Sequence, residues 1–369
     1  MLVITALNIV VVIMAYLARF DKHRYLLAWA FLLLALVLGI RYGYGNDFFT
    51  YKYMFDHGYP EKGLAENVEP GWFFLNQLFR PFGFSVFVFL LTVVEHLLLY
   101  NLIRRYVPPH YYWLAVFIYL FNPSYMLIGL SMMRQFFVQI LGFYAMAFAY
   151  KRKYIQFAVI ILICISIHKV GYLLVPLIMI PWILRFSSSK SLLIFSSVIL
   201  FGIIYIATNM NVVIDNLVEI FAQSDMKYGN SYLNDTDIGE ERRINPKLII
   251  MYALYLLLLA RTFKFLPDNN PSKLFAIEVT LGLIFIPFSI ISPMAMRTSW
   301  VYSIVVIITM PLLIQYEKVP IIKYGTIICF ALLLFREYYN HFCSDIYGAY
   351  YMNYHTIFSE YAIDNIRMY

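Results

Sequence analysis

Long uncharged apolar runs recur along the whole chain, and they constrain the fold more than any other feature. Residues 25–40 form one of them, and runs of about 15 to 20 residues follow up to residue 335. Each is long enough to cross a hydrocarbon core of about 30 Å. The runs are continuously apolar and do not alternate with period two, which favours helices over a barrel. The sequence therefore predicts an all-α polytopic integral membrane protein.

Composition excludes a soluble fold. Only 13% of the residues are charged and 62% are hydrophobic, whereas soluble domains are about 25% charged. No segment is polar enough for a soluble domain, so we expect a single transmembrane domain over residues 1–369. The net charge of +7 reflects where lysines sit relative to the bilayer, and no nucleic-acid partner is expected. The first run starts at residue 2 without a basic n-region or cleavage site, and we expect a retained span.

The runs predict about twelve spans, several of them short. They cover residues 2–18, 25–40, 83–103, 110–122, 125–149, 154–167, 170–184, 191–208, 247–263, 273–291, 299–316 and 320–335.

Charge alternates along the connections between these spans. Every second connection is basic, with 15 Lys and Arg in total against the acids Asp21, Asp268 and Glu317. The two long connections are acidic, with five acids and three bases in residues 41–70 and seven and three in 209–246. The positive-inside rule then places both termini and both long loops outside the cytoplasm.

The external loop 41–82 is expected to contain an interfacial helix. From Glu69, apolar residues including Trp72 recur at helical spacing, and Pro81 and Gly83 end the pattern. The external loop 209–246 is expected to act as a lid or to be mobile. The tyrosine-rich tail after residue 336 reads as an interfacial aromatic belt.

Ionisable residues at membrane depth are costly and point to function. Four cations gather towards the outer side, and arginine's planar fork suits phosphate or carboxylate. Singly, each has a plainer explanation: snorkelling at a helix end, pairing with an internal carboxylate such as Glu95, or a hydrogen-bonded helix-end histidine. Together, converging cations require an anion. The four are Arg134, His168, Lys169 and Arg297, with Arg41 and Arg336 at outer helix ends.

Metal and cofactor motifs are not found in the sequence. There is no His-Glu-x-x-His or Cys-x-x-Cys, and "DTD" at 235–237 reads as part of an acidic lid rather than a chelator. "GYG" at 43–45 lacks the strand and the Gly-Lys-Ser/Thr of a phosphate loop. We expect no metal and no cofactor.

Several short motifs occur in one order along the chain. They are Arg-x-Gly-x-Gly-x-Asp-aromatic (41–48), Glu-Pro-Gly-Trp (69–72) with Asn76, Met-Arg-Gln (133–135), a span-closing His168, "MRTSWVY" (296–302) and "YHTIF" (354–358). With these motifs the chain resembles the EpsG-type branch of Wzy-like bacterial polysaccharide polymerases, which make O-antigen, capsule or exopolysaccharide. It departs from the family pattern after Gln135 and after His168, where small residues are usual.

The resemblance implies a metal-independent glycosyltransferase with a GT-C-like bundle in the bacterial inner (plasma) membrane, with its active site facing the periplasmic or extracellular side. Donor and acceptor would both be polyprenyl-diphosphate-linked oligosaccharides, and the acceptor would offer a hydroxyl. Membrane lipid, a chain-length regulator and a flippase of the same pathway are the other implied partners.

Roles for individual residues follow from that chemistry. Fixed cations would stabilise the departing diphosphate, and we assign this to Arg134 and Arg297, with Arg41 as a further contact. The general base would be His168 or Asp47, with Glu69 as a sugar binder or an orienter of an arginine. No nucleophile is evident, which favours inversion. The remaining expected substrate-binding residues are Asn76, Gln135, Lys169, Trp300, Tyr302 and Arg336.

Three other classes stay open at this point. A flippase for lipid-linked oligosaccharide repeat units would be expected to show two similar halves and basic groups reachable from both sides. An O-acyltransferase would need its histidine at a central or cytoplasmic acyl site. A scaffold would not need buried arginines.

Overall fold

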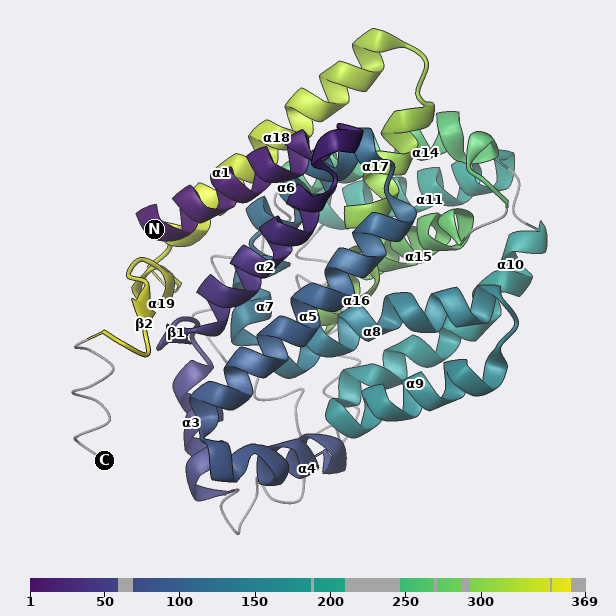
Figure 1. Ribbon diagram of the computed structural model, residues 1–369. Coiled ribbons are helices and arrows are strands. Elements are labelled where there is room, and N and C mark those ends of the chain that lie inside the picture. Colours follow the sequence, from purple (N-terminus) through teal and green to yellow (C-terminus); the bar gives the residue numbers. More distant parts are fainter. Residues whose placement is uncertain are drawn as a thin grey trace.

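The computed structural model describes residues 1–58, 69–186, 189–209, 246–268, 271–286, 293–345 and 347–359. This part is a helical bundle with one two-stranded sheet (Figure 1). The strands, α3 and α4 lie at one end of the bundle, which we call the motif end (Figure 1). The opposite end, where α5 finishes and the Lys- and Arg-rich connections lie, we call the basic end. The predicted loop 209–246, with its "DTD" triplet, lies outside the described residues except for its first and last residues.

Each predicted span coincides with one or more helices. The long helices are α1 (Leu2–Leu17), α2 (Tyr25–Gly39), α5 (Phe84–Tyr106), α8 (Met133–Tyr150), α9 (Tyr154–Ile167), α11 (Ser189–Thr208), α14 (Pro246–Thr262), α15 (Ser272–Ile284) and α18 (Pro320–Phe342). The shorter ones are α3 (Phe48–His57), α4 (Pro70–Phe79), α6 (Tyr112–Phe121), α7 (Met126–Ser131), α10 (Ile180–Phe186), α16 (Pro293–Ser303), α17 (Val306–Tyr316) and α19 (Gly348–Tyr351).

Membrane-crossing length is clear for only some of these helices. Asp21–Gly39 and Phe84–Tyr106 are long and apolar enough, and Arg297–Ser303 with Val306–Tyr316, bent by 46°, makes a third if the pair is one span. Other helices expose large apolar side chains, such as Leu162 on α9 and Leu332 on α18, as expected of surfaces that face lipid. The helical membrane class is therefore supported, and the number twelve stays a prediction.

The short helix α6 lies in the core of the bundle. Its residues Leu114, Ala115, Val116 and Ile118 are at most 1% exposed, and it packs against α1, α17 and α18. A helix that is apolar on all sides is expected to be buried. Protein surrounds this helix, which agrees with the half-membrane length of its apolar run.

Two chain irregularities shape the motif end. The predicted span 125–149 breaks at Met132 (φ −88°, ψ 56°), so that α8 starts one residue before Arg134. Helix α9 ends at Ile167, and His168 is extended before the 3₁₀ helix Lys169–Met179 begins. Both irregularities put a polar side chain at a helix end, where the backbone changes direction.

The C-terminal segment returns to the motif end and pairs with the first motif. Strand β1 (Arg41–Tyr42) runs antiparallel to β2 (His355–Thr356), with Arg41 opposite Thr356. Tyr351 is fully buried against Tyr44, and its hydroxyl donates to the carbonyl of Leu127. The prediction of an interfacial belt is therefore wrong for Tyr351, because protein rather than headgroups surrounds its ring.

Candidate active site

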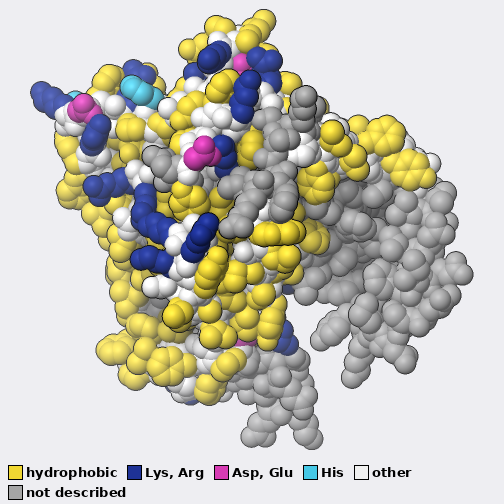
Figure 2. Space-filling view, turned by 90° about the vertical axis from the view of Figure 1, so that its right-hand side faces the viewer, with side chains coloured by type: hydrophobic (Ala, Val, Ile, Leu, Met, Phe, Trp, Pro, Cys, Tyr) yellow, Lys and Arg dark blue, Asp and Glu magenta, His cyan; other side chains and the backbone are white. Residues whose placement is uncertain are grey.

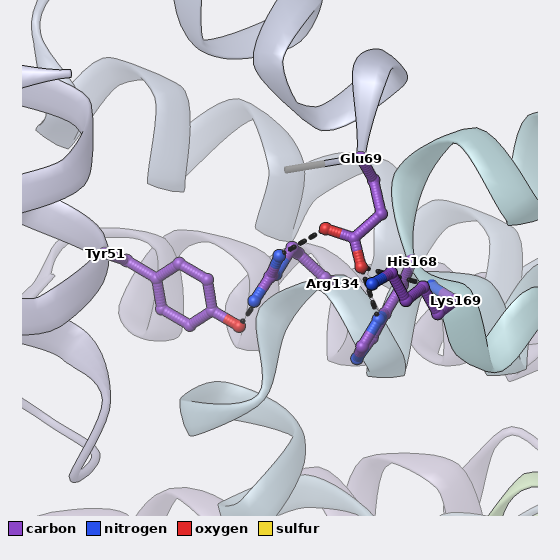
Figure 3. Close-up of polar contacts among 5 residues, drawn as sticks. All are labelled: Tyr51, Glu69, Arg134, His168 and Lys169. Carbon is purple, nitrogen blue, oxygen red and sulfur yellow. Dashed lines mark hydrogen bonds and ion pairs between the residues drawn. The ribbon is translucent and has the colours of Figure 1, made fainter. Parts of the chain in front are cut away.

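Glu69 is the centre of a polar cluster at the motif end. It precedes α4 and is only 6% exposed. Its Oε2 accepts a hydrogen bond from Nη1 of Arg134 at 2.7 Å, and its Oε1 accepts from Nδ1 of His168 at 3.1 Å and from the backbone N–H of Lys169 at 3.2 Å (Figure 3). A carboxylate therefore holds a guanidinium and an imidazole from two different helix ends.

Close backbone approach makes this contact possible. Helix α4 packs on α9, and a Cβ on Gly71 would lie 2.3 Å from Oγ and 2.9 Å from the carbonyl oxygen of Ser166. Only glycine fits there without displacing α4. Gly71 thus lets Glu69, two residues earlier, reach the end of α9.

The hydrogen bond to Glu69 fixes the proton arrangement on His168. A carboxylate only accepts, so Nδ1 carries the proton. In the neutral imidazole, Nε2 then keeps its lone pair. This is the arrangement of a histidine held ready to take a proton by an orienting carboxylate.

Tyr51 holds Arg134 from the other side. The Tyr51 hydroxyl oxygen accepts from Nε of Arg134 at 3.3 Å, and the guanidinium carbon lies 5.4 Å from the ring centroid. Figure 3 shows the guanidinium between Tyr51 and Glu69. Two fixed partners from α3 and the start of α4 thus orient the arginine.

Asp47 lies near Arg134, on the loop between β1 and α3. The backbone N–H of Asp47 donates to Oγ of Ser131 at 3.1 Å, and that hydroxyl donates to Oδ1 of Asn46 at 2.5 Å. Gly45 has φ +108°, and a Cβ there would lie 3.1 Å from Cα of Ser131. The glycine lets the loop close on the end of α7.

Electrostatics distinguish the two carboxylates. Burial tends to raise the pKa of Glu69, but the hydrogen bond from His168 and the charge of Arg134 outweigh it and lower the pKa from 4.5 to about 2. For Asp47 burial dominates and raises the pKa, against the opposing effects of Ser131, Arg297 and Arg134. Glu69 is thus a permanent anion at neutral pH, whereas Asp47 binds a proton more readily.

The structure brings five of the sequence-predicted residues together at the motif end. They are Asp47, Glu69, Arg134, His168 and Lys169, the last through its backbone N–H. Arg297 is exposed on α16 and acts electrostatically on Asp47.

Arg41 lies in a different environment from the one expected. It is 2% exposed, and its guanidinium donates to the carbonyls of Leu38 at 2.7 Å and Leu130 at 3.3 Å and to the Thr92 hydroxyl at 2.9 Å. Glu95, the internal carboxylate considered for Arg134, interacts electrostatically with Arg41 instead. Protein groups enclose Arg41 in this conformation, and its contact with substrate stays a prediction.

The other expected binding residues are spread over several helices. Asn76 and Gln135 are buried on α4 and α8. Tyr302 is buried on α16, and its hydroxyl donates to the carbonyl of Leu173. Trp300 is half-buried on α16, and Arg336 is exposed on α18. Their substrate contacts stay predictions.

Sequence reasoning missed two partners of the site. Neither Tyr51 nor Ser131 is among the residues that the sequence predicted for the site. Tyr51 follows Asp47 by four residues, and Ser131 precedes Arg134 by three. Helical spacing from Asp47 could have pointed to Tyr51, whereas the break at Met132 separates Ser131 from the helix of Arg134.

The fold and the site together define a class of protein. It is a helical membrane protein in which a buried carboxylate holds an arginine and a histidine at one end of the bundle. The chain belongs to the EpsG family, whose match spans residues 24–356. Membership confirms the resemblance and suggests a polymerase of polysaccharide biosynthesis of glycosyltransferase type. No curated protein and no solved structure matches the chain significantly.

Proposed function

We propose that the protein polymerises polysaccharide by moving a polyprenyl-diphosphate-linked glycan onto a hydroxyl of another lipid-linked repeat unit. The reaction takes place at the motif end, which faces the outer leaflet if the basic connections are cytoplasmic. The observation that carries the proposal is the double hydrogen bonding of Glu69 to Arg134 and His168. It combines a base oriented for proton transfer with a fixed cation.

The proposed step is a single displacement that inverts the anomeric centre. Nε2 of His168 takes the proton of the acceptor hydroxyl, whose oxygen attacks the anomeric carbon. The bond from that carbon to the diphosphate oxygen breaks, and the diphosphate leaves with the electron pair. Arg134 and Arg297 stabilise the charge that develops on it. No metal takes part in this scheme, and the bundle belongs to the GT-C kind.

Asp47 is the second candidate for the base. Its raised pKa makes it a better proton acceptor than an ordinary aspartate. Arg134 and Arg297 next to it are the same cations that would hold the diphosphate. His168 is favoured because Glu69 fixes its ring and its tautomer.

Complementation of cells that lack the chain tests this proposal. Arg134→Lys keeps the charge but loses the fork held by Tyr51 and Glu69, and we expect at least a 10-fold loss of polymer. His168→Ala is expected to lose 10²- to 10⁴-fold, the usual range for a general base. Arg19→Lys, at the basic end, is the matched control. Glycan length in lipid extracts is the readout.

The location of the unpolymerised units separates the possible outcomes. Single repeat units in the outer leaflet of His168→Ala cells are expected. Units trapped inside would indicate a flippase and overturn the proposal. Normal polymer with His168→Ala and none with Asp47→Asn would move the base to Asp47.

A further inference from the structure

The basic end of the bundle contains two cavities that meet at the end of α5. One, of about 540 Å³, lies between α5 and α8, and the other, of about 730 Å³, lies between the starts of α2 and α6 and the end of α17. Arg104, Arg105 and Tyr106 line both. Helix α5 has 23 residues, so this place is roughly 30 Å from the cluster around Glu69.

Within the described residues, the acids of the basic end pair with cations outside the smaller cavity. Asp21 pairs at 2.6 Å with Arg24, which lines the larger cavity, Glu317 pairs with Arg261 at 2.6 Å, and Asp268 pairs with Lys273. Within the described ranges, no salt bridge reaches Arg104, Arg105 or Lys151, which all line the smaller cavity. Figure 2 shows Lys and Arg side chains gathered on this face with far fewer acidic ones.

Nearby tyrosines partly orient the two arginines. Nη1 of Arg104 donates to the Tyr100 hydroxyl at 3.4 Å, and the guanidinium of Arg105 lies 5.5 Å from the ring centroid of Tyr106. Tyr112 at the start of α6 donates to the carbonyl of Arg104 at 3.4 Å. Two adjacent arginine forks, one beside a tyrosine hydroxyl and one beside a tyrosine ring, are suited to bind phosphate oxygens.

The smaller cavity is amphipathic along its length. Leu98, Leu102, Ala147 and Phe148 line it together with the cations at the helix ends. A free phosphate has no apolar part that could pack against this wall. A phospholipid would place its glycerol and first methylenes there and its headgroup phosphate on the arginines.

We propose that the crevice between α5 and α8 binds an acidic phospholipid, with its headgroup phosphate on Arg104, Arg105 and Lys151. Basic pockets between membrane helices on the positive-inside face are suited to such headgroups. The lipid bridges α5 and α8 at the end opposite the cluster around Glu69. This site does not depend on the proposed polymerase activity.

Lipid binding to the purified full-length protein is the test, followed by native mass spectrometry and by the shift in Tm. Phosphatidylglycerol is expected to bind more tightly than phosphatidylcholine of the same chains. The double variant Arg104→Gln, Arg105→Gln should bind phosphatidylglycerol about 25-fold more weakly, from roughly fivefold for each basic side chain. The double variant Lys22→Gln, Lys153→Gln removes the same charge from exposed lysines outside both cavities and should bind normally.

A further variant separates lipid from free phosphate. Ala147→Leu fills the apolar part without changing charge, and it should weaken phosphatidylglycerol binding. Inorganic phosphate should neither raise the Tm nor displace the lipid. Stabilisation by phosphate alone, equal binding of phosphatidylcholine, or an equal loss in the lysine control would each overturn the proposal.

A measurement on the wild type covers the case in which the arginine variant fails to fold. Photoactivatable phosphatidylglycerol should crosslink to residues of α5 and α8 near the cavity. Crosslinks spread evenly over the basic face, or confined to other helices, would overturn the assignment.

Discussion

Glu69 connects the other polar groups of the candidate site. Its carboxylate is nearly buried and bonded to three donors, two of them side chains that can be charged. Such a group stabilises the fold only while it is ionised, because the protonated acid would leave Arg134 without its counter-charge. The low pKa of Glu69 therefore means that ionisation of this carboxylate stabilises the folded state.

The pH dependence of this contribution has a definite sign. The pKa of Glu69 falls from 4.5 to about 2 on folding, so the native state binds fewer protons and the stabilisation is complete above pH 4.5. It is lost as pH falls from 4.5 towards 2. We expect Glu69→Gln to lower the Tm at neutral pH, with a gap that closes as pH falls from 4.5 towards 2. Asp345→Asn, at an exposed carboxylate, is the control, and a gap that does not shrink in acid would contradict this assignment.

Tyr51 is expected to act as a positioning residue for Arg134. Tyr51→Phe removes the oxygen that accepts from Nε but keeps the ring beside the guanidinium. We expect a cost of about 1 kcal/mol in stability and shorter polymer at equal protein level. Tyr53→Phe, at an exposed tyrosine of the same helix, should change neither. Arg134→Lys and Tyr51→Phe together should be less than additive, and full additivity would show that Tyr51 does not act through Arg134.

At the scale of elements, the contact between α4 and α9 decides whether the cluster forms. Gly71 faces Ser166 so closely that any side chain must move one helix. We expect Gly71→Ala to push α4 outward, break the contact of Glu69 with His168 and abolish polymer. Gly325→Ala on α18 has open space and should be neutral or slightly stabilising, since alanine favours helix.

A readout for the helix shift accompanies this prediction. A cysteine pair across α4 and α9 should crosslink in the parent and less in Gly71→Ala. Normal crosslinking with normal polymer would show that α4 yields to the extra methyl group without consequence.

At the scale of the whole molecule, the C-terminal segment closes onto the first motif. The N–H of Ile357 donates to the carbonyl of Ile40 at 2.9 Å, next to the β1–β2 pairing. Ile357→Pro removes that donor, and we expect the tail to become sensitive to protease and polymer to shorten. Ile357→Ala keeps the N–H and is the matched control. Equal protease resistance in both variants would show that this bond does not hold the tail.

The helical membrane class followed from the sequence because burial in lipid is a property of each run by itself. A continuous apolar run has to satisfy its own backbone bonds wherever it packs. The charge bias of the connections is local in the same way, and so are the short motifs that carried the resemblance to the EpsG family, to which the chain belongs. The helix starting after Glu69 was also found, because Pro70 at its first position and the Pro81 and Gly83 breakers are local signals.

The partners of the charged residues were decided only by the tertiary structure. The sequence offered Glu95 as a partner of Arg134 and Glu69 as the orienter of an unspecified arginine. In the structure Arg134 bonds to Glu69, 65 residues away in the chain, and Glu95 interacts electrostatically with Arg41. Which carboxylate meets which arginine depends on helix rotation, on the break at Met132 and on the close contact at Gly71. These arise from packing between distant segments, whereas the sequence by itself determined the apolar runs, their helical form and the residue types available for the site.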